Sequence, residues 1–450
     1  MSFLPPQTLA EPQAEPPAQS VTMANGGETV RKVGRRIMWY LVALYIISVI
    51  DRANLGFASF SMNRDLGLTP QMYGVGLGVL FLGYALFEIP SNIILARFGA
   101  RVTLTRIGVA FGLITMSMAM VTGPTSFYVV RGMLGIAEAG LTPGVFLFLS
   151  FWIPQSYRAR YNAVFTYSIA AAYVLVSLIS GSVLLLDGTW GISGWKWMFI
   201  LEGMPAVVLG IVGFVYLTDR PHQAQWLSAG ERQWLDTELS KENAGNISAH
   251  GDGFGRLLKT SLLWMLSFVY VGIFCGNACM TAWQPQILHA AGISLKAIGW
   301  VSAIPPLLGV IGMTFICRHS DRREERVQHT AVSCLLAALG YGTVAISTDA
   351  VTATVGFALA NIGVYSSLAI FWSIPQTFLS TKAKPAAIAF IASFGALFGG
   401  WLAPMGIGRI QGATGSLAVG LAVVAGLFVI SAAAVLVSGR QITKKTARHE

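Results

Sequence analysis

Charged residues are scarce in this chain of 450 residues. Asp, Glu, Lys and Arg make up 11% of it, whereas hydrophobic residues make up 54%. A typical soluble domain carries about 25% charged residues. The shortage excludes a protein covered by water, a disordered chain and a nucleic-acid-binding protein, because each needs a higher density of charge. Most of the chain must therefore face lipid, and we expect no nucleic-acid partner.

Cysteine and histidine are also rare, with four and six residues. Cys275, Cys279, Cys317 and Cys334 lie in or beside apolar stretches, and we interpret them as small packing residues. Neither they nor the histidines show the spacing of a disulfide framework or a metal site. No nucleophile, base and orienting group can be assembled either. We therefore expect no enzyme, no metal and no cofactor.

The sequence contains instead a series of long apolar runs. Twelve of them reach the length of about 20 residues that a helix needs to cross a bilayer, and they lack the period-two alternation of membrane strands. The runs occupy residues 37–58, 73–95, 102–122, 125–150, 161–186, 196–218, 261–284, 296–317, 327–347, 350–376, 385–408 and 414–438. Gly74, Gly76 and Gly78 resemble a phosphate-binding loop, but they lie inside such a run and follow no strand, so we interpret them as helix-packing residues. The pattern predicts an all-α membrane protein.

Lysine and arginine are distributed unevenly between the loops. With the N-terminus in the cytoplasm, 24 of the 30 fall in cytoplasmic segments and four in external ones. Cationic loops are retained on the cytoplasmic side, so both termini are expected there. The polar stretch 219–260 has six spans on each side, which is typical of transporters built from two repeated halves.

Five segments follow from this pattern. Residues 1–36 are rich in proline and are expected to form a disordered cytoplasmic tail without a signal peptide. The other expected segments are an N-terminal six-helix bundle at 37–218, a cytoplasmic linker at 219–260, a C-terminal six-helix bundle at 261–438 and a cytoplasmic tail at 439–450.

Several charges lie inside the predicted spans, where each costs roughly 2.5–3.5 kcal/mol at the bilayer centre. Asp51 and Arg52 lie in the first span, Glu88 in the second, and Arg131 and Glu138 on one face of the fourth. One interpretation is two buried ion pairs with a purely structural role. The other is functional: protonating Asp51 or Glu138 leaves an arginine unmatched, so proton binding and carboxylate binding favour each other.

Polar side chains beside these charges are candidate ligand contacts. Asn54 shares the helix face of Asp51, and Tyr84 shares that of Glu88. Tyr84 is a candidate substrate contact or a packing residue, and we favour a structural or gating role for Glu88.

Two polar stripes stand in the second half. Gln284 ends one stripe, next to Pro285, which is expected to interrupt the seventh span. Tyr365 and Trp372 belong to another stripe on the tenth span. Such stripes face protein or a water-filled cavity, and interhelical hydrogen bonds without any ligand are an equally good interpretation.

Several motifs resemble the anion:cation symporter family of the major facilitator superfamily. They are Asp51-Arg52-Ala53-Asn54-Leu55, the segment from Arg131 to Gly140 followed by Pro143-Gly144 and Trp152-Ile153-Pro154, Trp283-Gln284-Pro285-Gln286, and His319-Ser320-Asp321-Arg322. The resemblance extends from about residue 35 to residue 438. It implies twelve transmembrane helices in two pseudo-symmetric six-helix bundles around a central site.

The resemblance also implies residue roles. Arg52, Arg131 and Tyr84 would contact the substrate, and Asp51 and Glu138 would handle protons. The cytoplasmic gating loops would contain Arg97 and Arg101, in a motif that lacks its usual Asp, and Asp321 and Arg322. In the eleventh span, where relatives often carry Asn, only Ser393 retains a polar side chain near Gly399-Gly400, which favours a more apolar substrate.

The function expected is proton-coupled import of an organic carboxylate, such as an aromatic, hydroxy or sugar acid, by alternating access. The alternatives are an anion exchanger, an exporter of aromatic compounds or, from another class, a membrane sensor. A sensor would need a folded output domain, and 219–260 and the two tails are too short for one. We expect a monomer in a bacterial inner membrane, with a small organic anion and protons as its partners.

Overall fold

The apolar runs form long helices whose ends are set by short polar or glycine signals. Thr69 accepts a hydrogen bond from the backbone of Met72 at the start of the second span (3.2 Å). Asp349 accepts from the backbones of Val351 and Thr352 at the start of the tenth (2.9 Å each). These side chains satisfy amides that have no partner in the first helical turn.

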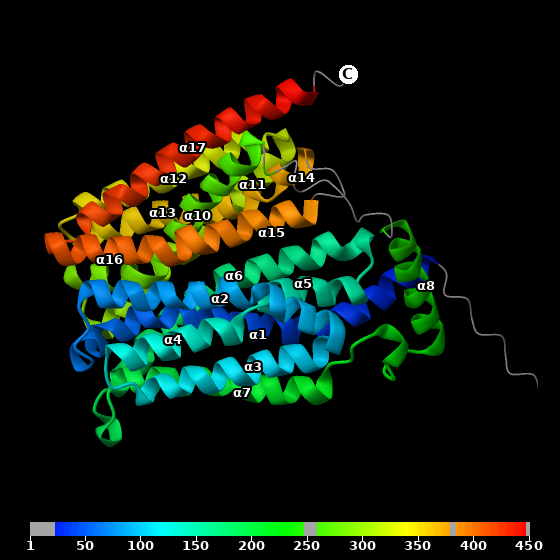
Figure 1. Cartoon of the computed structure of the whole chain (residues 1–450), viewed down its shortest axis with the longest axis horizontal. Coiled ribbons are helices and arrows are strands. Elements are labelled where there is room, and N and C mark those ends of the chain that lie inside the picture. The colour runs from blue at the N-terminus through cyan, green and yellow to red at the C-terminus, as the bar shows by residue number, and fades with distance from the viewer. Residues whose placement is uncertain (1–22, 247–257, 259, 379–383, 447–450) are drawn as a thin grey trace, which may run out of the picture.

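The structure is a computed structural model that describes residues 23–246, 258, 260–378 and 384–446 (Figure 1). Within these residues, twelve helical segments are long and apolar enough to cross a membrane. The expected all-α membrane fold is confirmed. The first bundle contains α1 (Met23–Asp65), α2 (Pro70–Phe98), α3 (Ala100–Ser117), α4 (Pro124–Glu138), α5 (Leu141–Trp152), α6 (Gln155–Val183) and α7 (Gly194–Tyr216). The second contains α10 (Ser261–Ala290), α11 (Leu295–Arg323), α12 (Arg326–Ile346), α13 (Ala350–Phe371), α14 (Ser373–Phe378), α15 (Lys384–Gly395), the π-helical η5 (Ala396–Leu402), α16 (Ala403–Thr414) and α17 (Ala418–Thr446).

Helix α8 (Ala229–Asn246) lies between the bundles in sequence and packs on the first bundle, at the right of Figure 1. Lys32 of α1 donates to Glu231 of α8 (2.8 Å), and the rings of Trp152 and Trp226 stack 5.5 Å apart. We call this end of the molecule the linker end. The opposite end, with turns at Gly67 and Gly292, is called the turn end.

The terminal helices extend into the segments that the sequence analysis assigned to the two tails, 1–36 and 439–450. Helix α1 begins at Met23, because its first turns pack on other elements: Gly26 lies against Trp234 and Gly34 against Tyr161. Residues 1–22 lie outside the described residues. At the other end, α17 continues to Thr446, beyond the predicted boundary at 438.

The fourth span, predicted at 125–150, is confirmed as one span from Pro124 to Trp152, but its helix is broken in the middle. Helix α4 ends at Glu138 and α5 starts at Leu141, with Gly140 between them in the left-handed conformation (φ 84°). Pro143 supplies no N–H for the carbonyl of Ala139, which breaks the helical hydrogen bonding. Gly140 is needed because a side chain there would meet the Ser91 hydroxyl at 2.5 Å. The break places Glu138 at a helix end inside the bundle.

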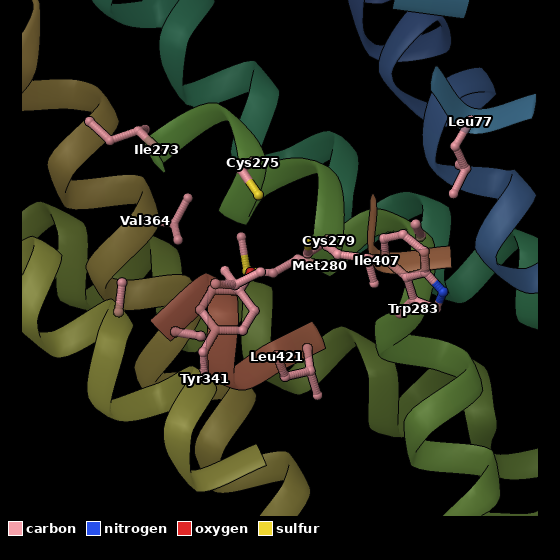
Figure 2. Packing of buried hydrophobic residues seen from close by; sticks show 14 of the residues in the cluster. Leu77, Ile273, Cys275, Cys279, Met280, Trp283, Tyr341, Val364, Ile407 and Leu421 are labelled. Carbon is pink, nitrogen blue, oxygen red and sulfur yellow. The ribbon is translucent and has the colours of Figure 1, made fainter. Parts of the chain in front are cut away.

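The apolar core confirms the interpretation of the cysteines. Cys275, Cys279 and Cys334 are buried, Cys317 is half-buried, and all four are free thiols. Figure 2 shows Cys275 and Cys279 on α10 among the apolar side chains around Tyr341.

Candidate functional site

The two bundles meet at the turn end through glycines. A methyl group on Gly181 of α6 would overlap the Cα of Gly299 of α11, and one on Gly74 of α2 would meet the Pro404 carbonyl of α16 at 2.6 Å. Gly78 of α2 lies against Trp401 in the same way. The glycine run is therefore a helix-packing surface, as expected. Its small residues let helices of the two bundles approach to backbone contact.

Pro285 does not interrupt α10, contrary to the sequence prediction; the helix continues from Ser261 to Ala290. The missing N–H leaves the carbonyl of Thr281 without its helical donor, and Gly56 of α1 packs directly against this carbonyl. The next carbonyl, of Ala282, accepts from the Tyr73 hydroxyl of α2 (3.1 Å). Contacts from the first bundle thus cover the carbonyls around the proline, and the helix continues although one of its hydrogen bonds is lost.

Pro306 has the same effect on α11. It frees the carbonyl of Ser302, which accepts from the Gln284 amide of α10 (2.9 Å) and from the Ser177 hydroxyl of α6 (3.3 Å). Ser177 belongs to the first bundle, so this hydrogen bond crosses the bundle interface. Gln284, predicted to bind substrate, is used here to hold two helices together.

A small cavity lies between the bundles beside this interface. Its walls include Phe57 and Tyr173 from the first bundle and Asn277, Asn361 and Tyr365 from the second, and Gln284 also lines it. Tyr173 and Tyr365 stack across the interface at 5.9 Å, and Asn277 donates to the Tyr173 hydroxyl (3.0 Å). The structure therefore brings the predicted Gln284 and Tyr365 together, with Tyr173 as an aromatic partner that the sequence did not indicate.

The charged residues form a second part of the site. Nε of Arg52 donates to Oε2 of Glu138 at 2.7 Å, and its Nη2 donates to Ser48 (3.1 Å). The guanidinium also lies over the Tyr84 ring, 5.2 Å from its centroid. Glu138 is completely buried, whereas 21% of the Arg52 side chain is exposed. Arg52 is thus the member of the pair that a ligand can reach.

Asp51 and Arg131 lie deeper and are not joined as an ion pair in the described part of the chain. Asp51 accepts from Thr115 of α3 (2.6 Å), and Nε of Arg131 donates to the Gly76 carbonyl (3.3 Å). Nη1 of Arg131 and Oδ2 of Asp51 are buried without a hydrogen-bond partner. The purely structural interpretation requires two ion pairs. Only the pair of Arg52 and Glu138 is formed in the described part of the chain.

Aromatic residues of the second bundle face this charged region. Tyr270 of α10 lies 4.7 Å from Trp372 (ring centroids) and within electrostatic range of Tyr84 and Tyr45. Tyr270 was missed because a lone tyrosine in an apolar run carries no polar stripe. Ser393 is half-buried on α15, two residues before Gly395, which packs on the Tyr270 ring.

Two further residues depart from the sequence analysis. Asn54 is completely buried and does not line the cavity. It interacts with Glu202 of α7, a buried carboxyl that the sequence analysis overlooked although it lies inside the predicted span 196–218. A simple search of that span for acidic residues would have found it.

The predicted gating residues lie at the linker end. The backbone N–H of Arg101 donates to Asp219 (2.8 Å), and the Arg101 guanidinium lies over Phe214. Asp219, just after α7, provides a carboxylate next to the loop that lacks its usual Asp. Arg97 lies over Phe98 (5.5 Å).

The corresponding loop of the second bundle follows α11. Asp321 forms an ion pair with Arg326, and Arg322 is exposed. No hydrogen bond or ion pair joins the two gating loops among the described residues.

Two six-helix bundles that enclose a polar cavity and buried charges define a membrane transport protein. The sequence profile of the Major Facilitator Superfamily matches residues 41–404, and the chain belongs to this family. It is therefore a secondary transporter and not an enzyme.

Known relatives agree with this assignment. The chain is 42% identical over 411 residues to a protein of Agrobacterium vitis provisionally named a tartrate transporter, covering 91% of this chain and 94% of that one. It is 37% identical to the quinolone resistance transporter of Acinetobacter baumannii, over 88% of this chain and 91% of that one. Among solved structures, an inward-facing bacterial homologue of the human lysosomal transporter Spinster matches with a TM-score of 0.74, at 17% identity over 92% and 98% of the chains.

Proposed function

We propose that this protein imports an organic hydroxycarboxylate together with protons by alternating access. The observation that carries the proposal is the ion pair of Arg52 and Glu138, in which the arginine is partly exposed and the carboxylate is completely buried. A substrate carboxylate and Glu138 compete for the same guanidinium. Protonation of Glu138 releases Arg52 to the substrate, which links proton binding to anion binding.

Arg131 supplies the second positive charge. Its unpartnered Nη1 and the unpartnered Oδ2 of Asp51 lie within electrostatic range of each other. When Asp51 and Glu138 are both protonated, the cluster of Asp51, Arg52, Arg131 and Glu138 carries two positive charges and favours an anion with two carboxylates. Guanidinium groups suit carboxylates because they bind them in a bidentate manner.

The cavity between the bundles supports the choice of substrate class. Asn277, Gln284 and Asn361 offer amide groups for hydroxyls, and Tyr173 and Tyr365 offer aromatic surface. A relative of 42% identity is provisionally named for tartrate, a dicarboxylate with two hydroxyls. Gln284, Tyr365, Trp372 and Ser393 remain proposed substrate contacts, whereas Asn54 is completely buried and does not line the cavity.

The turn end is closed by backbone contacts, whereas no hydrogen bond or ion pair joins the gating loops at the linker end in the described residues. With both termini in the cytoplasm of a bacterium, as the distribution of lysine and arginine favours, this is a state open to the inside. Arg97, Arg101, Asp321 and Arg322 then close the linker end in the opposite state. We propose that a monomer completes this cycle, because each chain contains both bundles and the cavity between them.

Uptake of labelled tartrate into proteoliposomes tests the proposal. Accumulation should require an acidic exterior and collapse when a protonophore is added. Glu138→Gln should retain tartrate exchange but lose accumulation, because Arg52 is then free at every pH. Accumulation that ignores the proton gradient would contradict proton coupling, and absence of uptake for a panel of hydroxy acids would contradict the substrate class.

Export of aromatic compounds is a second candidate, favoured by the 37% identity to a quinolone resistance transporter and by the stacked Tyr173 and Tyr365. Expression in a bacterium that lacks its main efflux pumps distinguishes the two. Export predicts a raised inhibitory concentration of quinolones, whereas import predicts growth on the transported acid without any change in resistance.

A further inference from the structure

Glu202 is a buried carboxyl without a role in the transport cycle described above. Only 5% of the residue is exposed, and the Ser180 hydroxyl donates to its Oε1 at 2.7 Å. Its other oxygen, Oε2, is buried and has no hydrogen-bond partner. Acidic residues within membrane spans are rare and usually functional, because their burial is costly.

The crossing of α3 and α7 positions Glu202 near Asp51. Gly112 and Gly203 meet there: a methyl group on Gly203 would lie 2.8 Å from the Gly112 carbonyl. Glu202 precedes Gly203 on α7, and Thr115, one turn after Gly112 on α3, donates to Asp51. The two carboxyls therefore approach the same helix crossing from different helices.

Asn54 is a polar neighbour of both carboxyls. It follows Asp51 by three residues on the same face of α1, is completely buried, and interacts with Glu202. Neither polar atom of its amide has a hydrogen-bond partner within normal distance, and Oδ2 of Asp51 has none either. Buried polar groups are nearly always satisfied. Asp51, Asn54 and Glu202 therefore have unsatisfied polar atoms, which suit a proton that binds and leaves during the transport cycle.

Glu202 lies nearer the turn end than Asp51. Helix α7 starts at the turn end with Gly194, eight residues before Glu202. Helix α1 ends at the turn end with Asp65, fourteen residues after Asp51. At 1.5 Å per residue these are depths of about 12 Å and about 21 Å. A proton that enters from the turn end reaches Glu202 first.

We propose that Glu202 is a third proton-binding carboxyl, which exchanges a proton with Asp51 across Asn54. In this step Glu202 loses the proton and becomes a carboxylate, while Asp51 gains it and becomes neutral. The pair thus keeps one negative charge, which avoids two buried anions side by side. Asp51 is the charged group that acts on Glu202, and Ser180 and Asn54 are its polar neighbours. The proposal rests on proton-coupled transport as the function.

Glu202→Gln in proteoliposomes tests the proposal with tartrate as the probe. Proton-driven accumulation should fall about tenfold, whereas tartrate exchange, which needs no net proton movement, should stay within about twofold. Glu202→Asp should restore part of the accumulation, because it restores the carboxyl. Glu238→Gln, the same change at a half-buried glutamate of α8 outside the membrane spans, is the matched control. Equal accumulation by Glu202→Gln and wild type would overturn the proposal.

Infrared titration of the purified protein tests proton binding without any substrate. The carbonyl band of a protonated carboxyl should change with pH in the wild type, and this change should be missing in Glu202→Gln. A carboxyl with a purely structural role keeps its proton at all accessible pH values and shows no such change. If the wild-type protein does not accumulate tartrate, the proposed function is contradicted. The difference between the infrared titrations of wild type and Glu202→Gln still decides whether Glu202 exchanges a proton.

Discussion

Gly181 of α6 and Gly299 of α11 are in backbone contact across the interface of the two bundles. The contact leaves no room for a side chain on either helix while the turn end is closed. Both helices are continuous there, so the contact can open only when one bundle moves relative to the other.

Gly181→Leu should hold the turn end open. The added side chain overlaps α11 only in the closed state, so it shifts the equilibrium toward the open one. Labelling of Ser302→Cys by an impermeant thiol reagent, in a background without the native cysteines, measures this opening. Labelling should rise and transport should fall, whereas Gly426→Leu, which meets no neighbouring atom, should change neither. Unchanged labelling in Gly181→Leu would contradict this interpretation of the interface.

Pro306→Ala should weaken the closed turn end. The new N–H competes for the Ser302 carbonyl, which then holds Ser177 and Gln284 less strongly. Transport should slow, while the melting temperature stays equal or rises because the helix gains a hydrogen bond. Pro305→Ala is the control, because the carbonyl that Pro305 frees accepts no side-chain hydrogen bond in the described structure. Equal transport rates for the two variants would show that the carbonyl of Ser302 has no part in closure.

Arg52→Lys should reduce tartrate affinity roughly tenfold to a hundredfold, because a charged hydrogen bond of about 1.5–3 kcal/mol is lost or weakened. Lysine keeps the charge but not the bidentate geometry. The shift in melting temperature with added tartrate reports the affinity by mass action. Wild-type affinity in Arg52→Lys would show that the guanidinium does not bind the substrate.

The docking of α8 should weaken in acid. Partial burial acts to raise the pKa of Glu231, but hydrogen bonds from Lys32 and Ser228 outweigh it and hold the pKa below its usual range. A lowered pKa in the folded state stabilises docking at neutral pH, and this contribution is lost as the pH falls through the lowered value. The effect is below about 1 kcal/mol because the pair is partly exposed.

Proteolysis of α8 in detergent measures this docking. Cleavage of the wild type should increase modestly at low pH, and Glu231→Gln should show the faster cleavage already at neutral pH. Identical cleavage of both proteins at every pH would mean that the ion pair does not contribute.

The sequence predicts the spans because apolar length alone decides membrane insertion. It also identifies the buried charges, but not their pairing. Arg131 and Glu138 are seven residues apart on α4, and yet Glu138 pairs with Arg52 of α1, because the packing of α1 against α4 decides the partner. Pro285 shows a similar limit: proline predicts an interruption, but contacts from Gly56 and Tyr73 stabilise the continuous helix. Such compensation depends on a neighbouring helix and cannot be read from one segment.

The glycine contacts at the turn end have a consequence for how this kind of protein diversifies. There, closure depends on main-chain atoms and on the absence of side chains, whereas the cavity and the arginines offer side chains to a ligand. Apart from Gln284, which lines the cavity and also donates to the Ser302 carbonyl, the two tasks use different residues of the chain. Residues that contact the cargo can therefore change while the closing contacts stay intact, and two relatives of this chain are named for cargoes as different as tartrate and quinolones.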